Sequence, residues 1–141
     1  MKDQTDPATQ AFARLADALE RLAPPAPDWL VAPAYVWTGA TARQVSSIDA
    51  PDLRLLRGID LQKQAVHDNV LRHASGAAAH DMLLWGARGT GKSALLRAAV
   101  KAALAENPAT IALVQLAPNA VEQLPALIAM HAAEERRYLD N

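Results

Sequence analysis

The sequence predicts an α/β protein, in which crossover helices join the strands of a parallel sheet. Beyond residue 50, apolar runs of strand length alternate with helix-like segments, an order typical of such a sheet. A glycine-rich turn joins the first of these runs to a helix. We therefore expect an N-terminal helix and a Pro/Ala-rich connector over residues 1–50, followed by an incomplete α/β domain over 51–141.

Composition and charge exclude several classes of protein. Of the 141 residues, 51% are apolar and 21% are charged, which is a globular rather than a disordered balance. A formal charge of −1 gives no signal for nucleic acid or for anionic lipid. The absence of cysteine excludes disulfides, thiolate catalysis and thiolate zinc sites. The polar N-terminus, and the lack of an apolar run near the ~20 residues that span a bilayer, predict a cytoplasmic protein.

The first predicted element is a helix that begins at Pro7, with Asp6 as its N-cap, and ends before Pro24-Pro25. Its large apolar residues recur every three or four positions and so form one stripe. We expect this stripe to pack on the neighbouring domain; the alternative is a helix that binds a partner or oligomerises. The stripe consists of Phe12, Leu15, Leu19 and Leu22.

A connector, a short strand and irregular chain follow, and helices and strands alternate regularly after residue 51. The connector runs to Pro33, the strand covers Ala34–Trp37, and Thr38 to Pro51 is expected to be irregular. Asp60 can cap the next helix, which has Val66 and Val70 on its inner face. The predicted elements from there on are a helix over 61–73, a buried strand over 81–85, a helix over 92–106, a strand over 111–116 and a helix opened by Pro125.

The turn between the predicted strand over 81–85 and the next helix fits the phosphate-binding pattern G-x-x-x-x-G-K-[ST]. Glycines let the backbone turn sharply and bring its N–H groups close to phosphate oxygens. The following helix directs its N-terminal dipole at the anion. The context of a strand before the loop and a helix after it favours a phosphate site over an unoccupied glycine turn. The loop reads Gly86, Ala87, Arg88, Gly89, Thr90, Gly91, Lys92 and Ser93.

Individual side chains of the loop have separate expected roles. Lys92 supplies a charge that can reach the β and γ phosphates, and the hydroxyl of Ser93 can ligate Mg²⁺. We expect Arg88 to point to solvent, although a catalytic role is possible. Trp85 is expected to pack in the core beneath the turn, with stacking on a nucleobase as the alternative.

Residues 85–93, W-G-A-R-G-T-G-K-S, resemble the phosphate loop of AAA+ ATPases, in which a G-T-G-K-[ST] ending is common. Together with L-R-G-I-D-L-Q-K at 56–63 and L-L-W at 83–85, they are similar to one bacterial AAA+ group, the domain-of-unknown-function 815 group, whose members are ATP-binding proteins of unassigned role. The resemblance implies an AAA+-like P-loop NTPase fold, with the Walker A residues Gly86–Ser93 around the phosphates of Mg-ATP. It also implies that the backbone at Gly58-Ile59 lies against the adenine; the alternatives are a turn at Gly58 and a core role for Ile59.

An AAA+ ATPase also needs an apolar strand that ends in two acids, the Walker B motif. The run Ile111–Leu116 continues into Ala117-Pro118 without an acid, and Glu134-Glu135 comes too late after the preceding apolar segment. We therefore identify no catalytic residue, and we expect the chain to resemble the front half of a longer protein. The histidines show no metal-ligand spacing either; they are His67, His73, His80 and His131.

Two functions of different classes remain open. The first is Mg-ATP binding within an AAA+ ATPase whose Walker B motif and lid lie beyond this chain; its partners are ATP and either another protein or further copies of itself. The second is a nucleotide-binding module without hydrolysis. Another P-loop NTPase, such as a small-molecule kinase or a GTPase, is a further alternative, although no N-K-x-D guanine-reading segment occurs.

Overall fold

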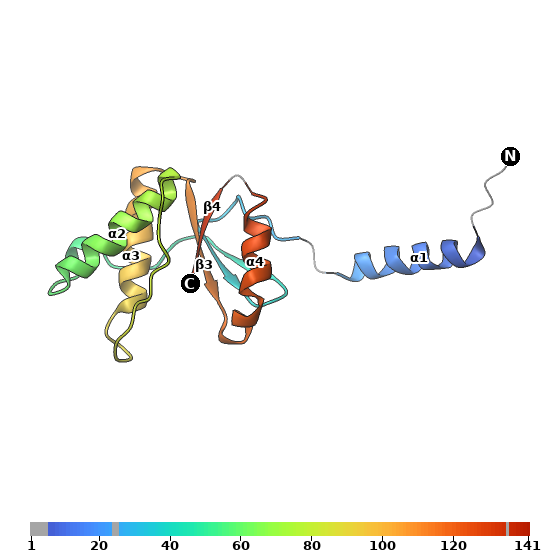
Figure 1. Cartoon of the computed structure of the whole chain (residues 1–141), viewed down its shortest axis with the longest axis horizontal. Coiled ribbons are helices and arrows are strands. Elements are labelled where there is room, and N and C mark those ends of the chain that lie inside the picture. The colour runs from blue at the N-terminus through green and yellow to red at the C-terminus, as the bar shows by residue number, and fades with distance from the viewer. Residues whose placement is uncertain (1–5, 24–25, 135) are drawn as a thin grey trace.

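The computed structural model describes residues 6–23, 26–134 and 136–141. It is a mixed α/β architecture with a four-stranded, mostly parallel sheet (Figure 1). The helices are α1 (Pro7–Leu22), α2 (Asp60–Ser75), α3 (Lys92–Glu106) and α4 (Leu124–His131), with short 3-10 turns η1 (Leu53–Leu55) and η2 (Pro118–Gln123). The strands are β1 (Ala34–Trp37), β2 (Ala42–Val45), β3 (Ile111–Leu116) and β4 (Arg137–Asp140).

The sheet has the strand order β2-β1-β3-β4. β1 runs parallel to β3, and β3 runs parallel to β4, so the expectation of a mostly parallel sheet is confirmed. The sequence did not predict β4 as a strand. β2 is antiparallel to β1, so the prediction of irregular chain from Thr38 to Pro51 is wrong at Ala42–Val45, whereas the remaining residues of that range form no helix or strand. The reason is a tight hairpin turn: Thr38 N–H donates to the Thr41 carbonyl oxygen at 3.0 Å, and Gly39 supplies φ = +95° at the first central position.

Helices cover both faces of the sheet. In Figure 1, α2 and α3 lie on one side of β3 and α4 lies on the other. Alternate residues of the strands divide between two core clusters: Ile111 and Leu113 belong to the cluster with α2 and α3, whereas Ala112 and Val114 belong to the cluster with Leu127 of α4. The sheet is therefore a central layer whose two faces are both buried.

The predicted strand over 81–85 is not a strand in the structure. Residues 78–85 have no regular secondary structure, and the side chains of Leu83 and Trp85 are each 86% exposed. The expectation that Trp85 packs in the core is therefore also wrong. An apolar run becomes a strand only where a neighbouring strand completes its hydrogen-bond ladder. This segment instead lies across a cavity from β4, the end strand of the sheet.

α1 forms as the sequence predicts, but its apolar stripe does not pack on the rest of the described chain. No residue of α1 is buried, and Figure 1 shows the helix projecting away from the sheet. The predicted packing on the neighbouring domain is therefore wrong. The physical reason is that α2, α3 and α4 already cover both faces of the sheet. The helix ends at Leu22, and Pro24-Pro25, which the sequence predicts to end it, lie outside the described residues.

The predicted division of the chain after residue 50 stays a prediction. Strands β1 and β2, which precede that position, pair within the same sheet as β3 and β4. Trp29, Tyr35 and Trp37 join the cluster on the α4 face, so residues before position 50 contribute to the core. None of the helices in the described part of the chain has the length and apolarity that crossing a bilayer requires.

We expect Leu127→Ala to lower the free energy of unfolding by about 2–5 kcal/mol, because Leu127 is fully buried in the α4-face cluster and its truncation leaves a cavity. The neighbouring Ile128 is 51% exposed and provides a matched control. Ile128→Ala should change the free energy by only about 0.5 kcal/mol. Chemical denaturation followed by circular dichroism measures both values, and equal losses would contradict the assignment of this core.

Candidate functional site

The glycine-rich loop connects the extended segment 78–85 to the first turn of α3. Gly89 and Gly91 have φ values of +84° and +86°, a left-handed conformation that residues with a Cβ rarely adopt. A Cβ added at either position would meet no atom within 4 Å. The loop therefore needs glycine at these positions for its backbone conformation and not for space.

Among the described residues, no side chain caps the N-terminus of α3. Gly91 is the N-cap and offers no side-chain hydrogen bond, and the first turn contains no acidic residue. The first N–H groups of any helix lack intrahelical acceptors, and the helix dipole gives this end a partial positive charge. The end of this 15-residue helix can therefore accept an anion.

The ammonium group of Lys92 lies inside the loop. Its Nζ donates to the carbonyl oxygens of Gly86 at 2.9 Å and Ala87 at 2.7 Å, and it lies 3.3 Å from Oγ1 of Thr90. The hydroxyl of Thr90 in turn donates to the Ala87 carbonyl oxygen at 2.9 Å. Contacts with three residues of the loop thus hold the positive charge of Lys92 beside the N-terminus of α3. The sequence-predicted residues from Gly86 to Lys92 are thus brought together.

A cavity of about 750 Å³ adjoins the loop and is lined by Lys92 and Ser93. Its walls come from α2, α3, α4, residues 79–84 and the end of the chain from Tyr138 to Asn141. The volume lies within the range of small-molecule sites, which is roughly 300–1,000 Å³. Ser93 is exposed at this cavity, so its hydroxyl is accessible to a ligand.

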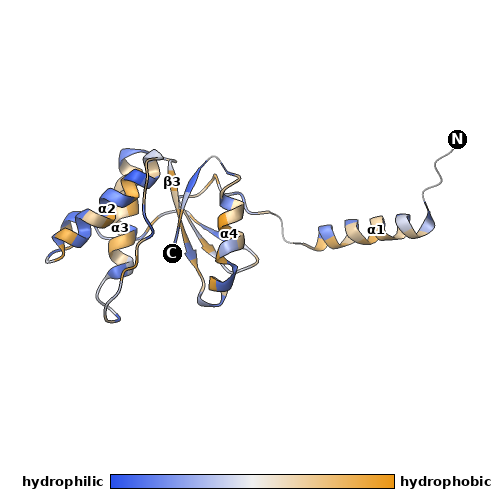
Figure 2. Ribbon diagram, viewed as in Figure 1, coloured by the Kyte–Doolittle hydropathy of each residue, from blue (hydrophilic) through white to orange (hydrophobic). Residues whose placement is uncertain are grey.

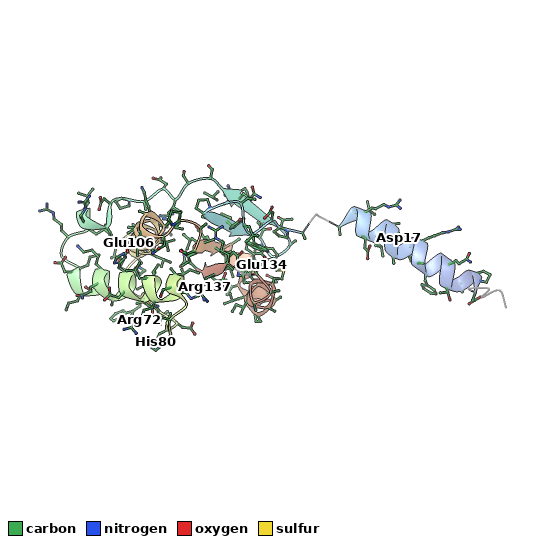
Figure 3. The ribbon with its side chains drawn as sticks, turned by 90° about the horizontal axis from the view of Figure 1, so that it is seen from above. Asp17, Arg72, His80, Glu106, Glu134 and Arg137 are labelled. Carbon is green, nitrogen blue, oxygen red and sulfur yellow. The ribbon has the colours of Figure 1, made fainter. Side chains whose placement is uncertain are left out.

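The extended segment that leads into the loop is fixed to α2 by one side chain. The amide of Asn69 donates to the His80 carbonyl oxygen at 2.7 Å and accepts from the His80 N–H at 2.9 Å. These two bonds imitate the pairing that a neighbouring strand would give. Figure 3 shows His80 beside Arg72 of α2. The sequence did not predict this role for Asn69, because His80 lies eleven positions further along the chain.

A carboxylate that sequence analysis missed lies on the wall of the same cavity. Asp140 is the last residue of β4, and its Oδ1 lies 3.2 Å from Nδ1 of His131 at the end of α4. Since Tyr138 of the same strand belongs to the α4-face cluster, the alternation of β4 puts Asp140 on that face too. Asp140 therefore lies beside His131, on the side of the sheet opposite α3. The run Arg137–Asp140 is too short and too polar to be recognised as a strand in sequence.

The aromatic ring of Tyr138 stacks on His131 beneath this carboxylate. The ring centroids are 4.1 Å apart, and the interplanar angle is 20°. Burial, and after it the charge of Glu134, raises the pKa of the Tyr138 phenol to about 12. The phenol therefore stays protonated at neutral pH and donates to the Trp29 carbonyl oxygen at 3.1 Å. It supports His131 and supplies no charge to the cavity.

Other residues singled out by the sequence do not line the cavity. Ile59 is the N-cap of α2 and packs against the cluster on the α2/α3 face; it is absent from the cavity lining, and its contact with adenine stays a prediction. Arg88 is exposed, as expected. Glu134 follows α4 and does not line the cavity, and Glu135 lies outside the described residues. Among the described residues, no group of three or more His, Asp or Glu side chains is arranged to hold a metal ion.

Comparison with known proteins gives one family. A sequence profile of the family described as "Protein of unknown function (DUF815)" matches residues 31–139. The match includes the loop, the cavity wall except Asp140 and Asn141, and all four strands of the sheet except the last residue of β4. No curated protein and no solved structure matches the chain.

We expect Asn69→Ala to release the segment before the loop, because it removes both bonds to His80. Each bond contributes about 1 kcal/mol, so the loss of both should make amide hydrogen exchange at His80 faster by roughly thirtyfold. Asp68→Ala, at the exposed neighbouring position of α2, is the matched control and should leave that exchange rate unchanged. Unaltered exchange in Asn69→Ala would show that other contacts hold the segment.

Proposed function

The chain belongs to the DUF815 family, and we propose that it binds Mg-ATP through the loop Gly86–Ser93. One observation carries the proposal: the Lys92 ammonium is held at the centre of a glycine loop, beside a helix N-terminus that has neither a side-chain cap nor an acidic residue. Such a site concentrates positive charge and N–H donors, and a polyphosphate supplies the matching negative charge and acceptor oxygens.

The residues present fit the ligand. Lys92 uses two short bonds to position its ammonium, and its third contact, with Thr90 at 3.3 Å, is the weakest and so the easiest to exchange for a phosphate oxygen. The exposed hydroxyl of Ser93 can ligate Mg²⁺. Magnesium bound with ATP takes most of its ligands from phosphate and water, so the proposal does not require a cluster of protein carboxylates. When bound, Mg²⁺ would neutralise charge on the phosphates.

We further propose that the chain is part of an AAA+ ATPase. Its support is the resemblance of residues 56–63 and 83–93 to the AAA+ pattern and the parallel arrangement of β1, β3 and β4. Hydrolysis in that class needs a carboxylate that orients the attacking water. Asp140 lines the cavity, but it is paired with His131 on the opposite face of the sheet.

A second candidate function is nucleotide binding without turnover. The observation that favours it is the position of Asp140, because a carboxylate on the α4 face, 3.2 Å from the imidazole of His131, is not directed at the phosphate loop. In this form the nucleotide orders the loop and α3 and no bond is broken. Both functions require nucleotide binding, but only the ATPase releases phosphate. Binding and phosphate release are therefore tested in separate experiments.

We expect Lys92→Ala to weaken Mg-ATP binding by about an order of magnitude or more, because it removes the charge held inside the loop. Isothermal titration calorimetry at matched salt measures the dissociation constants. Arg88→Ala removes one positive charge from the same loop, but from an exposed side chain without a described contact in the loop, and is the matched control. It should change the affinity much less. Equal affinities of the wild type and Lys92→Ala would overturn the proposal.

We expect the 141-residue chain to release phosphate from ATP no faster than the uncatalysed background, because its one carboxylate at the end of β4 faces α4. A coupled phosphate-release assay with wild type and Lys92→Ala measures this. A rate well above background that Lys92→Ala abolishes would contradict the expectation and would make Asp140 and Glu134 the next residues to replace.

A further inference from the structure

α1 carries an apolar stripe that contacts nothing in the described chain. Phe12 is 73% exposed, Leu22 is 82% exposed, and Leu15 and Leu19 are more than half exposed. Figure 2 shows hydrophobic residues on α1 although the helix stands away from the sheet. Single exposed apolar residues need no explanation, but four on one face of one helix mark an interaction surface.

The spacing of the stripe is that of a helix that packs on another helix. The intervals from Phe12 to Leu15, Leu19 and Leu22 are three, four and three residues, so these side chains take the a and d positions of a heptad. One turn earlier, Ala8 continues the series. A strict a/d stripe of this kind is narrower than the face by which a helix covers a sheet, and it is the seam of a helix pair or bundle.

The residues beside the stripe are small and uncharged. Ala11, Ala16 and Ala18 occupy the flanking e and g positions, which lets a second helix approach closely. The charged residues lie on the opposite face; they are Arg14, Asp17, Glu20 and Arg21. Figure 3 labels Asp17 on this projecting helix. The seam itself therefore presents no charge that would have to be removed from water when it is covered.

The charges of α1 favour a second copy of the same helix as the occupant. The helix carries two arginines and two acidic residues, so two copies do not repel each other through net charge. Asp6 stands at the N-cap position and Arg21 lies in the last turn, so antiparallel copies set opposite charges side by side. A membrane surface is disfavoured, since helices that bind anionic lipid have a polar face rich in Lys and Arg.

We propose that α1 is a self-association element, through which copies of this chain pack together along the Phe12, Leu15, Leu19 and Leu22 seam. An isolated helix of 16 residues is only marginally stable in water, and burial of its seam against a second copy supplies the missing stabilisation. This inference is independent of nucleotide binding, because α1 contributes nothing to the loop or to the cavity.

The test is the molar mass of the full chain over a range of protein concentrations, measured by light scattering and by sedimentation equilibrium. We expect the wild type to reach a multiple of the 15.1 kDa of one chain as the concentration rises. Leu15→Glu puts a charge in the seam and should return the mass to that of one chain. Leu19→Ala keeps helix propensity while removing apolar surface, and it should weaken the association at least tenfold.

Ala13→Glu is the matched control, because it adds the same charge to the opposite, exposed face of α1 and should leave the wild-type mass unchanged. The thermal unfolding of the sheet domain should be the same in all variants, since no residue of α1 is buried. A wild type that stays at 15.1 kDa at every concentration overturns the proposal, whether α1 then binds phosphatidylglycerol vesicles or its own domain. An oligomer that survives Leu15→Glu also overturns it, because another surface then holds the copies together.

Discussion

The parallel pairing of β1 with β3 is the constraint on which the rest of the structure depends. It joins residues 34–37 to residues 113–116 and sets Ala34 opposite Leu113 and Trp37 opposite Leu116. Because side chains alternate along a strand, this register sends Ala34 and Leu113 to the α2/α3 face. It sends Tyr35 and Val114 to the α4 face. A slip by one residue would exchange the two faces, and the helices would lose the surfaces on which they pack.

The position of the phosphate loop follows from that pairing through α3. The buried side of α3, which includes Leu95, Ala99, Val100 and Ala103, packs on the face that Ile111 and Leu113 present. This packing fixes α3 on the sheet, and it thereby also fixes the position of the helix N-terminus. The loop residues at this end are mostly exposed and depend on their own short contacts with Lys92. A well-packed helix thus presents a polar and accessible binding element.

The wall of the cavity opposite the loop is formed by β4, and the position of this strand determines where its carboxylate lies. β4 is the last strand in the order, and it is tied to α2 by His73, whose Nε2 lies 2.7 Å from the Tyr138 carbonyl oxygen. On the other face, His131 engages Asp140 and stacks on Tyr138. The bond from His73 and the stacking of His131 hold β4 in place, and Asp140 lies beside His131 and not beside the loop. Lys92 of the loop and Asp140 of β4 therefore line the same cavity, but Asp140 lies beside His131 and is not directed at Lys92.

Local features were determined by the sequence alone, and nonlocal ones by the tertiary structure. The helices over 7–22, 60–75 and 92–106, the strands at 34–37 and 111–116 and the glycine conformations of the loop follow from caps, periodicity and φ preferences within a few residues. The state of residues 81–85, the exposure of Trp85, the pairing of β2 and β4 and the partner of Asp140 did not follow. Each of these depends on which distant backbone or side chain comes within hydrogen-bond reach, and an apolar run becomes a strand only where another strand lies beside it.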